Sequence, residues 1–269
     1  MSGILNPTDR QRYQHDGIVF PIRVLEPDEA ERYRRDCEDL EEHLGGRPRT
    51  VDVRQMHLHF RWACELARHE RVLDAVEGLL GPNLLVWATE LFAKHPQDGT
   101  ISIGWHRDRQ YMGFDPRETT TAWIALSEST VENGCMKAIP DPQRGSRPDG
   151  VGTAGRPGDA LPAEEGPIID VVLRPGEMSL HDSDILHGSG ANRSASKRVG
   201  FVVRYVTPEA RPPVDDAPAL LVRGRDDRGR FRLVEPPPDA AWEDSLAGLK
   251  QSAAHHLDAM LATLRRSGR

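Results

Sequence analysis

The sequence predicts a mainly β protein with flanking helices, and two features of the chain lead to this prediction. Between residues 83 and 206, short apolar or alternating runs follow one another, separated by Gly, Pro, Asp and Asn, which is typical of strands with tight connections. Longer charged segments of helical character lie before and after this region. Many short strands in succession favour a sandwich or a barrel over an alternating βαβ fold.

Two helices are expected ahead of the strands. The first begins at residues 26–29 (Glu-Pro-Asp-Glu), whose acidic side chains suit the first turn of a helix, and it ends at Gly45 and Gly46. The second is expected over 60–80, where apolar residues are interleaved with charges, and it ends at the Gly-Pro pair at 81–82. The strands are then expected at 83–94, 100–108, 119–126, 135–139, 168–173, 177–180, 185–187 and 198–206.

The interval 141–167 is rich in Gly, Pro and Asp and is too long for an ordinary connection between strands. We expect a surface loop there, or a lid over a site. A Pro-rich linker at 236–238 precedes the segment 240–264, which is expected to form a C-terminal helix or a pair of helices. Because the chain has no internal repeat, residues 1–269 are interpreted as one domain with N-terminal helices and a C-terminal helical extension.

The charge balance excludes one broad class of function. The chain has 269 residues with 35 Lys+Arg and 42 Asp+Glu, a net charge of −7, whereas a nucleic-acid binder needs a basic surface. No stretch approaches the roughly 18 apolar residues of a membrane span, and the N-terminus lacks the apolar segment of a signal peptide. We therefore expect a cytoplasmic protein without a nucleic-acid or membrane partner. The sequence leaves the oligomeric state open.

A metal site is predicted from the segment Gly-Trp-His-Arg-Asp at residues 104–108. On a strand, His106 and Asp108 project to the same face at a Cα separation of roughly 6.6 Å, so both can bind one metal ion. An isolated pair of this kind is also common as a surface feature, and its position at the end of a strand is what favours a site. A second histidine is needed, and His181 and His187 have the same strand parity, so alternation does not choose between them. Two imidazoles and a carboxylate on one face of a metal are typical of non-haem Fe(II) oxygenases.

An anion site is predicted from the hairpin that follows His187. Residues 188–194 (Gly-Ser-Gly-Ala-Asn-Arg-Ser) have turn chemistry, and the strand at 198–206 returns beside the histidine strand. Arg198 then faces an interior in which an unpaired guanidinium is costly, so it needs an anionic partner such as the distal carboxylate of 2-oxoglutarate. Arg204 has the same strand parity and is the alternative; we favour Arg198.

These residues lie in segments that resemble a known family. GWHRDRQYMGF, TAWIALSESTVENGCMKAIP and GEMSLHDSDILHGSGANRSASKRVGFVVRY resemble the phytanoyl-CoA dioxygenase family of Fe(II)- and 2-oxoglutarate-dependent oxygenases. The resemblance spans about residues 86–206, with a fainter match at 219–226. It implies a double-stranded β-helix core, the jelly-roll or cupin-like fold. It also implies that His106, Asp108 and His187 are the iron ligands, because His187 heads the H-x-S-x2-N-x-S-x3-R run.

The resemblance also assigns the co-substrate pocket. It implies that Arg198, helped by Ser189, binds the distal carboxylate of 2-oxoglutarate. Trp123 matches an aromatic residue that lines this pocket in the family, and His181 is then structural or lies behind the ligands. Asp-Pro-Gln at 141–143 replaces the family's usual Gly-Ser-His, and this departure concerns the substrate rather than the reaction class.

The predicted activity is oxidation of an unactivated C–H bond with Fe(II), 2-oxoglutarate and O2, releasing succinate and CO2. Asp108 favours hydroxylation over halogenation, because related halogenases have a small residue at that position. The alternative is a cupin-like hydrolase or isomerase that uses the same three ligands on another metal without 2-oxoglutarate, and Arg198 is the feature against it. A non-catalytic binding protein of the same fold would usually have lost a ligand, and none is missing here.

Substrate residues are predicted from polar groups near the ligand strand. Tyr111 and Gln110 follow the metal-binding segment, and His57 belongs to a polar and basic stretch ahead of the strands. Such groups suit a small polar or anionic substrate, for example a phosphonate, an amino-acid-like molecule or a natural-product intermediate; the alternative is that they are solvated. Lys94 ends a strand and is expected to reach the co-substrate or substrate, unless it is simply exposed.

Overall fold

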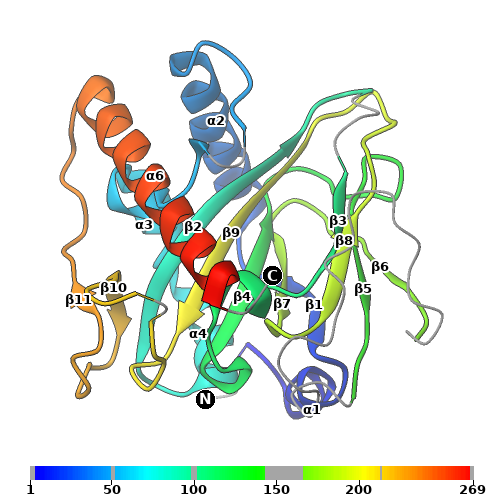
Figure 1. Cartoon of the computed structure of the whole chain (residues 1–269). Helices are drawn as coiled ribbons and strands as arrows, with labels where there is room; N and C mark the ends of the chain where they lie inside the picture. Colours follow the sequence, from blue (N-terminus) through cyan, green and yellow to red (C-terminus); the bar gives the residue numbers. More distant parts are fainter. Residues whose placement is uncertain (1–3, 50–51, 98–101, 143–165, 213, 267–269) are drawn as a thin grey trace.

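Two largely antiparallel sheets form the centre of the computed structural model, which describes residues 4–49, 52–97, 102–142, 166–212 and 214–266 (Figure 1). The sheets stay separate, and apolar side chains of both meet between them. The mainly β, jelly-roll prediction is confirmed. The larger sheet has seven strands in the order β1 (Ile18–Arg23), β7 (Glu177–His181), β4 (Thr119–Ala125), β9 (Arg198–Val206), β2 (Leu84–Lys94), β10 (Pro218–Arg223) and β11 (Arg232–Leu233). The smaller sheet has four, in the order β3 (Ile103–His106), β8 (Leu186–Ser189), β5 (Met136–Ile139) and β6 (Ile169–Val171).

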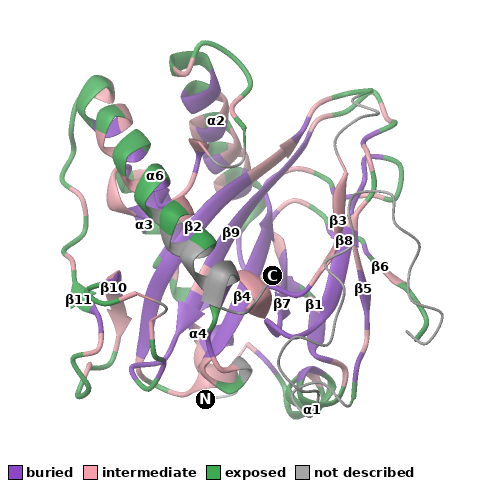
Figure 2. Ribbon diagram, viewed as in Figure 1, coloured by how far each residue is buried: buried purple, intermediate pink, exposed green. Residues whose placement is uncertain are grey.

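Helices cover the outer face of the larger sheet (Figures 1 and 2). There α2 (Pro27–His43), α3 (Arg61–Ala67) and α4 (Glu70–Leu80) pack around the main apolar core. Because side chains alternate along a strand, one face of β9 packs in this core and the other face points into the space between the sheets. Val199, Phe201, Val203 and Tyr205 lie in the core, whereas Arg198, Val202 and Arg204 line a pocket on the other face.

The predicted C-terminal helix is present as α6 (Trp242–Arg266), which starts near α3 and crosses in front of β2 and β9 in the view of Figure 1. Its first turns are anchored by stacking of the Trp242 ring on His43, with 4.0 Å between ring centroids. Leu249 is fully buried in the main core. The hydroxyl of Ser252 lies 2.7 Å from Nε2 of His59, so α6 is joined to the segment that precedes α3.

Several elements are present that the sequence pattern does not indicate. The helix α1 (Pro7–Asp16) buries only Tyr13, so it has no apolar periodicity, and its start is set by the Asn6 side chain, which accepts from the Asp9 N–H at 2.9 Å. Strand β1 contains Pro21, which has no N–H to donate; it is tolerated because β1 is an edge strand that pairs only with β7. The sequence pattern likewise does not indicate β10 and the edge strand β11.

The single helix predicted over 60–80 is wrong, because the chain forms α3 and α4 with a break at Arg68 and His69. Nothing in the local sequence marks this break. A contact from the sheet stabilises it: the hydroxyl of Tyr205 donates to the carbonyl of Ala67 at 2.7 Å, and both residues are fully buried. That acceptor lies in the last turn of α3, where carbonyls lack helical partners.

Two expectations concern segments that are only partly described. Most of the predicted lid at 141–167 lies outside the described residues, as does the start of the strand predicted at 100–108. Within the described part of the chain, no helix is both long and apolar enough to span a bilayer.

We expect Tyr205→Phe to lower the free energy of unfolding by about 1–2 kcal/mol, because it leaves the buried Ala67 carbonyl without its donor. Urea denaturation measures this. Tyr33→Phe is the matched control: Tyr33 is also buried, but its hydroxyl makes no hydrogen bond among the described residues, so a much smaller loss is expected. Equal losses in the two variants would show that the Ala67 contact is not what stabilises the break.

Candidate metal centre

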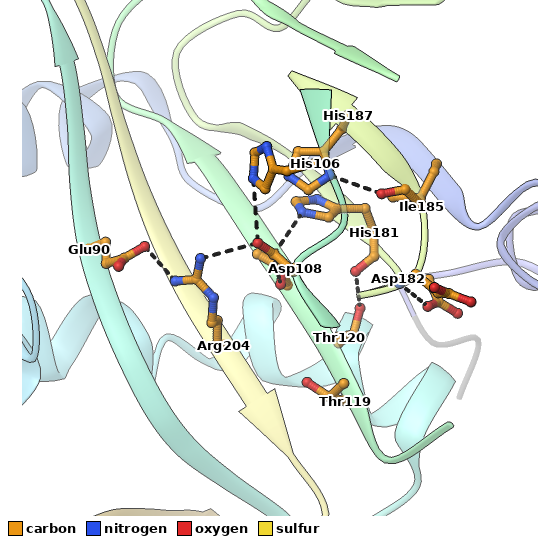
Figure 3. Close-up of polar contacts among 12 residues, drawn as sticks. Glu90, His106, Asp108, Thr119, Thr120, His181, Asp182, Ile185, His187 and Arg204 are labelled. Carbon is orange, nitrogen blue, oxygen red and sulfur yellow. Dashed lines mark hydrogen bonds and ion pairs between the residues drawn. The ribbon is translucent and has the colours of Figure 1, made fainter. Parts of the chain in front are cut away.

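Two histidines and an aspartate converge between the sheets (Figure 3). His106 ends β3 and His187 lies in β8; they are register partners, and their ring centroids are 4.2 Å apart. A carboxylate oxygen of Asp108 lies 3.7 Å from Nε2 of His106. The three candidate ligand atoms all lie within 4.8 Å of one another. The structure therefore brings together the three residues predicted as ligands, two from the HxD segment and one from far along the chain.

The route by which Asp108 reaches the cluster differs from the prediction. Strand alternation was expected to place His106 and Asp108 on one face, but β3 ends at His106 and Asp108 has helical backbone angles (φ −56°, ψ −35°). Asp108 is the N-cap residue of the short helix α5 (Arg109–Met112). The turn of the chain into α5, and not the pleat of a strand, directs the carboxylate toward the two imidazoles.

The backbone fixes the tautomer of both histidines. Nδ1 of His106 lies 2.8 Å from the carbonyl oxygen of Gly104, and Nδ1 of His187 lies 3.1 Å from that of Ile185. A carbonyl only accepts, so each Nδ1 carries a proton and donates it. Each Nε2 then keeps its lone pair, which is the arrangement that metal-binding histidines require.

The carboxylate of Asp108 is held by donors on both oxygens. Thr121 Oγ1 donates to Oδ2 at 3.1 Å, and Arg204 Nη2 lies 3.4 Å from Oδ1 (Figure 3). Burial alone would raise the pKa of Asp108, but the charge of Arg204 and a contact with His181 outweigh it, and the pKa lies well below its usual range. Burial, and then the nearby His106, hold the pKa of His187 well below its usual range. The carboxylate is thus ionised and His187 neutral, the forms that bind a metal ion.

His181, the other candidate histidine, lies beside this cluster and not in it. Its ring centroid is 4.8 Å from that of His187, and its Nε2 is 3.7 Å from Oδ2 of Asp108, the oxygen on the opposite side from His106. The side chain is buried, and neither ring nitrogen makes a hydrogen bond among the described residues. The geometry therefore places His187 in the cluster and His181 beside it, a choice that strand parity left open.

A pocket opens beside the cluster, and the buried cation Arg198 lies in its lining, with Lys94 next to it on the neighbouring strand. Arg198 and Lys94 are register partners on β9 and β2, and each is 2% exposed. Lys94 Nζ donates to the Ser189 hydroxyl at 2.7 Å and to the carbonyl of Gly134 at 3.3 Å. The pocket is lined by Phe92, Ile103, His106, Asp108, Thr121, Trp123, Met136, His181, His187, Gly188, Ser189, Arg198, Val202 and Arg204.

Arg198 is a buried guanidinium with no carboxylate partner among the described residues. Its Nη1 donates to the carbonyl of Gly134, its carbon Cζ lies 5.3 Å from the centroid of the Trp123 ring, and its Nε makes no hydrogen bond. Burial lowers the pKa of Arg198 to about 10, so the group is still charged at neutral pH. A buried charge without a counter-ion is costly, and the arrangement therefore suits an anionic ligand.

The Trp123 ring occupies space that Gly200 leaves open. Trp123 and Gly200 lie on neighbouring strands, β4 and β9, and a Cβ on Gly200 would approach Cζ2 of the ring to 2.0 Å. A rigid ring cannot move aside as a flexible side chain can. Glycine at position 200 is therefore what allows the indole to lie across the pocket beneath Arg198.

The three residues predicted for substrate lie outside the set that lines the pocket. Tyr111 in α5 packs its ring edge-on against His106 at 5.9 Å between centroids, and Gln110 is its neighbour in that helix. His57 is fully buried, and its Nδ1 lies 3.1 Å from the Thr89 hydroxyl. Of these three, Tyr111 is the one in contact with a candidate metal ligand.

Other residues of the site were missed by the sequence reasoning, although strand alternation contains the signal. Thr121 lies two residues before Trp123 on β4 and shares its face, and Glu90 and Phe92 share a face of β2 with Lys94. Extending the predicted residues along their strands in steps of two would have identified them, with one step to Thr121 and Phe92 and two steps from Lys94 to Glu90. Met136 of β5 carries no such signal, because it meets the pocket only through the packing of the smaller sheet.

The sequence of the chain is similar to those of a described family. A family model for phytanoyl-CoA dioxygenase (PhyH) matches residues 13–200, more than half of the chain. A probable alpha-ketoglutarate-dependent hypophosphite dioxygenase of Stutzerimonas stutzeri is 27% identical over 211 residues, which cover 73% of this chain and 72% of that protein. An ectoine dioxygenase of Streptomyces avermitilis is 26% identical over 221 residues, covering 71% and 75%.

The fold is shared with solved structures as well. The nickel complex of the non-heme monooxygenase ThoJ is 31% identical, with a TM-score of 0.76, and the likeness covers 95% of this chain and 99% of that one. A structure of CytC3 with Fe(II) and alpha-ketoglutarate matches with a TM-score of 0.65 over 87% of this chain and 94% of that one, at 22% identity, and supports the fold alone.

The contact between Gly200 and Trp123 can be tested without any ligand. We expect Gly200→Ala to lower the free energy of unfolding by about 1–3 kcal/mol, because the added methyl group overpacks against the indole. Gly190→Ala is the matched control, since a Cβ at Gly190 would meet nothing within 4 Å, and a change within about 0.5 kcal/mol is expected. Denaturant unfolding compares the two; a Gly200→Ala variant as stable as its control would contradict the packing argument.

Proposed function

The chain belongs to the phytanoyl-CoA dioxygenase family, and from this membership we propose that it is an Fe(II)- and 2-oxoglutarate-dependent dioxygenase. The observation that carries the proposal is the joint occurrence of two features in one pocket. A two-histidine, one-carboxylate cluster lies at one end, and a buried guanidinium without a counter-ion lies at the other. We further propose that residues 1–269 act as one catalytic domain with helical extensions.

The donor set fits ferrous iron. His106 and His187 would bind it through Nε2 and Asp108 through one carboxylate oxygen, leaving the remaining coordination positions open. Bound iron would supply the activation of dioxygen that no protein side chain provides. The protein's own part is to keep both imidazoles in one tautomer, to hold the carboxylate through Thr121 and Arg204, and to exclude bulk water with the buried walls of the pocket.

The opposite end of the pocket fits the distal carboxylate of 2-oxoglutarate. Arg198 presents a planar set of donors and lacks a carboxylate partner within the described chain, and Lys94 adds a second positive charge beside it. Ser189 contacts Lys94 and lines the same wall, and Trp123 closes the pocket beneath the guanidinium. These roles agree with the assignments that the sequence resemblance implies.

The substrate that we propose is a small polar or anionic metabolite, hydroxylated at an unactivated C–H bond with release of succinate and CO2. Two relatives are named for small polar compounds, hypophosphite and ectoine. Tyr111 is the favoured substrate residue because it lies against His106, with Gln110 beside it. His57 has the weaker geometric support, since it is buried against Thr89.

The decisive experiment adds Fe(II) and then 2-oxoglutarate to the metal-free protein under anaerobic conditions. We expect the visible charge-transfer band of iron-chelated 2-oxoglutarate in the wild type and in His181→Ala. His187→Ala should lose the band because it loses a ligand, and Arg198→Ala should require a much higher 2-oxoglutarate concentration to reach it. Absence of the band in wild-type protein that has bound iron would reject the dioxygenase and favour a metal-dependent hydrolase or isomerase.

A second experiment measures how the buried charge of Arg198 affects the free energy of unfolding. We expect Arg198→Met to raise the free energy of unfolding of the metal-free protein by about 1–2 kcal/mol, because an apolar side chain of similar length replaces a buried charge that has no counter-ion. The same variant should lose the stabilisation that saturating 2-oxoglutarate gives to the iron-loaded wild type, about 2.7 kcal/mol at 100 times Kd.

Arg117→Met is the control, because Arg117 is exposed and paired with Asp115; a stability change within about 0.5 kcal/mol is expected, with the response to 2-oxoglutarate retained. If Arg198→Met destabilised the metal-free protein or kept the wild-type response to 2-oxoglutarate, the assignment of Arg198 would be wrong.

A further inference from the structure

A line of buried charged groups of alternating sign, Arg54, Glu90 and Arg204, leads to the candidate iron ligand Asp108, and its last member Arg204 also lines the pocket. Arg54 Nε lies 2.7 Å from Glu90 Oε1. Figure 3 shows the next two contacts: Arg204 Nη1 lies 2.6 Å from Glu90 Oε2, and Arg204 Nη2 lies 3.4 Å from Asp108 Oδ1. Their side chains are 12%, 2%, 11% and 5% exposed in the order Arg54, Glu90, Arg204, Asp108, so solvent screens these contacts little.

Backbone pairing of β2 with β9 and with residue 54 brings the members of this line together. Glu90 on β2 and Arg204 on β9 lie on the neighbouring central strands of the larger sheet, with Arg204 in register with Ala88. Strand β10 pairs with β2 only near its start, at residues 84–86, which leaves that edge of β2 open further along. Residues 53–55 pair there instead, through a hydrogen bond from Gln55 N–H to the Thr89 carbonyl at 2.8 Å, and they bring Arg54 to Glu90.

The distances show that the guanidinium of Arg204 is bound mainly to Glu90 and turns only one nitrogen toward Asp108. Released from Glu90, an arginine at this position would be free to form the two-point fork that guanidinium groups make with carboxylates. Such a fork would engage both oxygens of Asp108, whereas the observed contact is a single one of 3.4 Å to Oδ1, and the fork would compete more strongly with a metal ion. Glu90 also offsets the positive charge of Arg204, which would otherwise repel a divalent cation at close range.

We propose that Arg204 is a positioning residue for the metal site, and that Glu90 and Arg54 hold its guanidinium in place. Arg204 holds Asp108 Oδ1 with a single N–H while Thr121 holds Oδ2, so that one oxygen of the carboxylate stays directed toward the two histidines. This inference rests on the proposed function, because it assumes that Asp108 binds the metal. A buried ion pair is by itself weak support for a role in stability, which makes the directed contact with Asp108 the informative feature.

The test measures metal affinity and ligand geometry, separately from turnover. Co(II) is titrated into metal-free protein, and its dissociation constant and visible ligand-field spectrum are recorded for the wild type, Glu90→Gln, Arg204→Gln and Arg204→Lys. We expect Glu90→Gln and Arg204→Gln to weaken Co(II) binding about 10-fold or more and to change the spectrum, as loss of a group that orients a metal ligand does. Arg204→Lys should recover only part of the affinity, because one ammonium cannot hold two carboxylates in the geometry of the fork.

Arg223→Gln is the matched control. Arg223 Nη1 also lies between two carboxylates, at 2.7 Å from Asp74 and 2.6 Å from Glu77, but on the far side of the larger sheet from the pocket. Its loss should leave the Co(II) dissociation constant and spectrum unchanged. If Arg204→Gln does not fold, Arg54→Gln tests the outer end of the line, and a smaller loss of affinity in the same direction is expected.

The possible outcomes separate this inference from the proposed function. Wild-type protein that binds neither Co(II) nor Fe(II) overturns both. Wild-type protein that binds metal and gives the 2-oxoglutarate band, while folded Arg204→Gln and Glu90→Gln keep the wild-type Co(II) dissociation constant and spectrum, overturns the positioning role alone. Loss of affinity in Arg223→Gln equal to that in Arg204→Gln also overturns it, because the effect would then not depend on a contact with Asp108.

Discussion

The site depends on one constraint on β9, which has to pack an apolar core on one face and hold buried charges on the other. Phe201 and Tyr205 lie in the helix-covered core, and Arg198 and Arg204 extend into the space between the sheets. Strand alternation keeps the two sets apart. Because β9 pairs with β2 and β4 along most of its length, a shift of one residue would exchange the arginines with core residues, so the core fixes the register of the site.

The two arginines on that face have different electrostatic surroundings. Arg204 is compensated within the chain by Glu90 and Asp108, and burial is thereby made tolerable. Arg198 contacts a carbonyl and an aromatic ring and has no carboxylate partner among the described residues, so its charge remains uncompensated. One guanidinium therefore belongs to the architecture of the metal cluster, and the other is suited to an external carboxylate. A difference in partners, not in residue type, separates the two roles.

Much of the fold and of the candidate site follows from local patterns. Alternating runs between Gly and Pro predict the eight central strands, and the HxD segment with a downstream histidine predicts the cluster. The pattern fails where long-range contacts decide local structure. The break between α3 and α4 is stabilised by Tyr205, which is more than 130 residues away in sequence, and β1 exists because β7 offers a free edge. The local propensity of a segment does not predict contacts with residues far away in the sequence.

The sequence by itself determined the chemical types of the candidate site: the candidate ligand types, their spacing, and the arginine that follows the second histidine strand. Only the tertiary structure decided between His181 and His187 by geometry and directed Asp108 toward the histidines through the turn into α5. It also paired Arg204 with Glu90, while Arg198 has no carboxylate partner in the part of the chain that the structure describes. The physical reason is that residue type sets what a side chain can bind, whereas the partner it meets depends on strand register and sheet packing, which are properties of the whole chain.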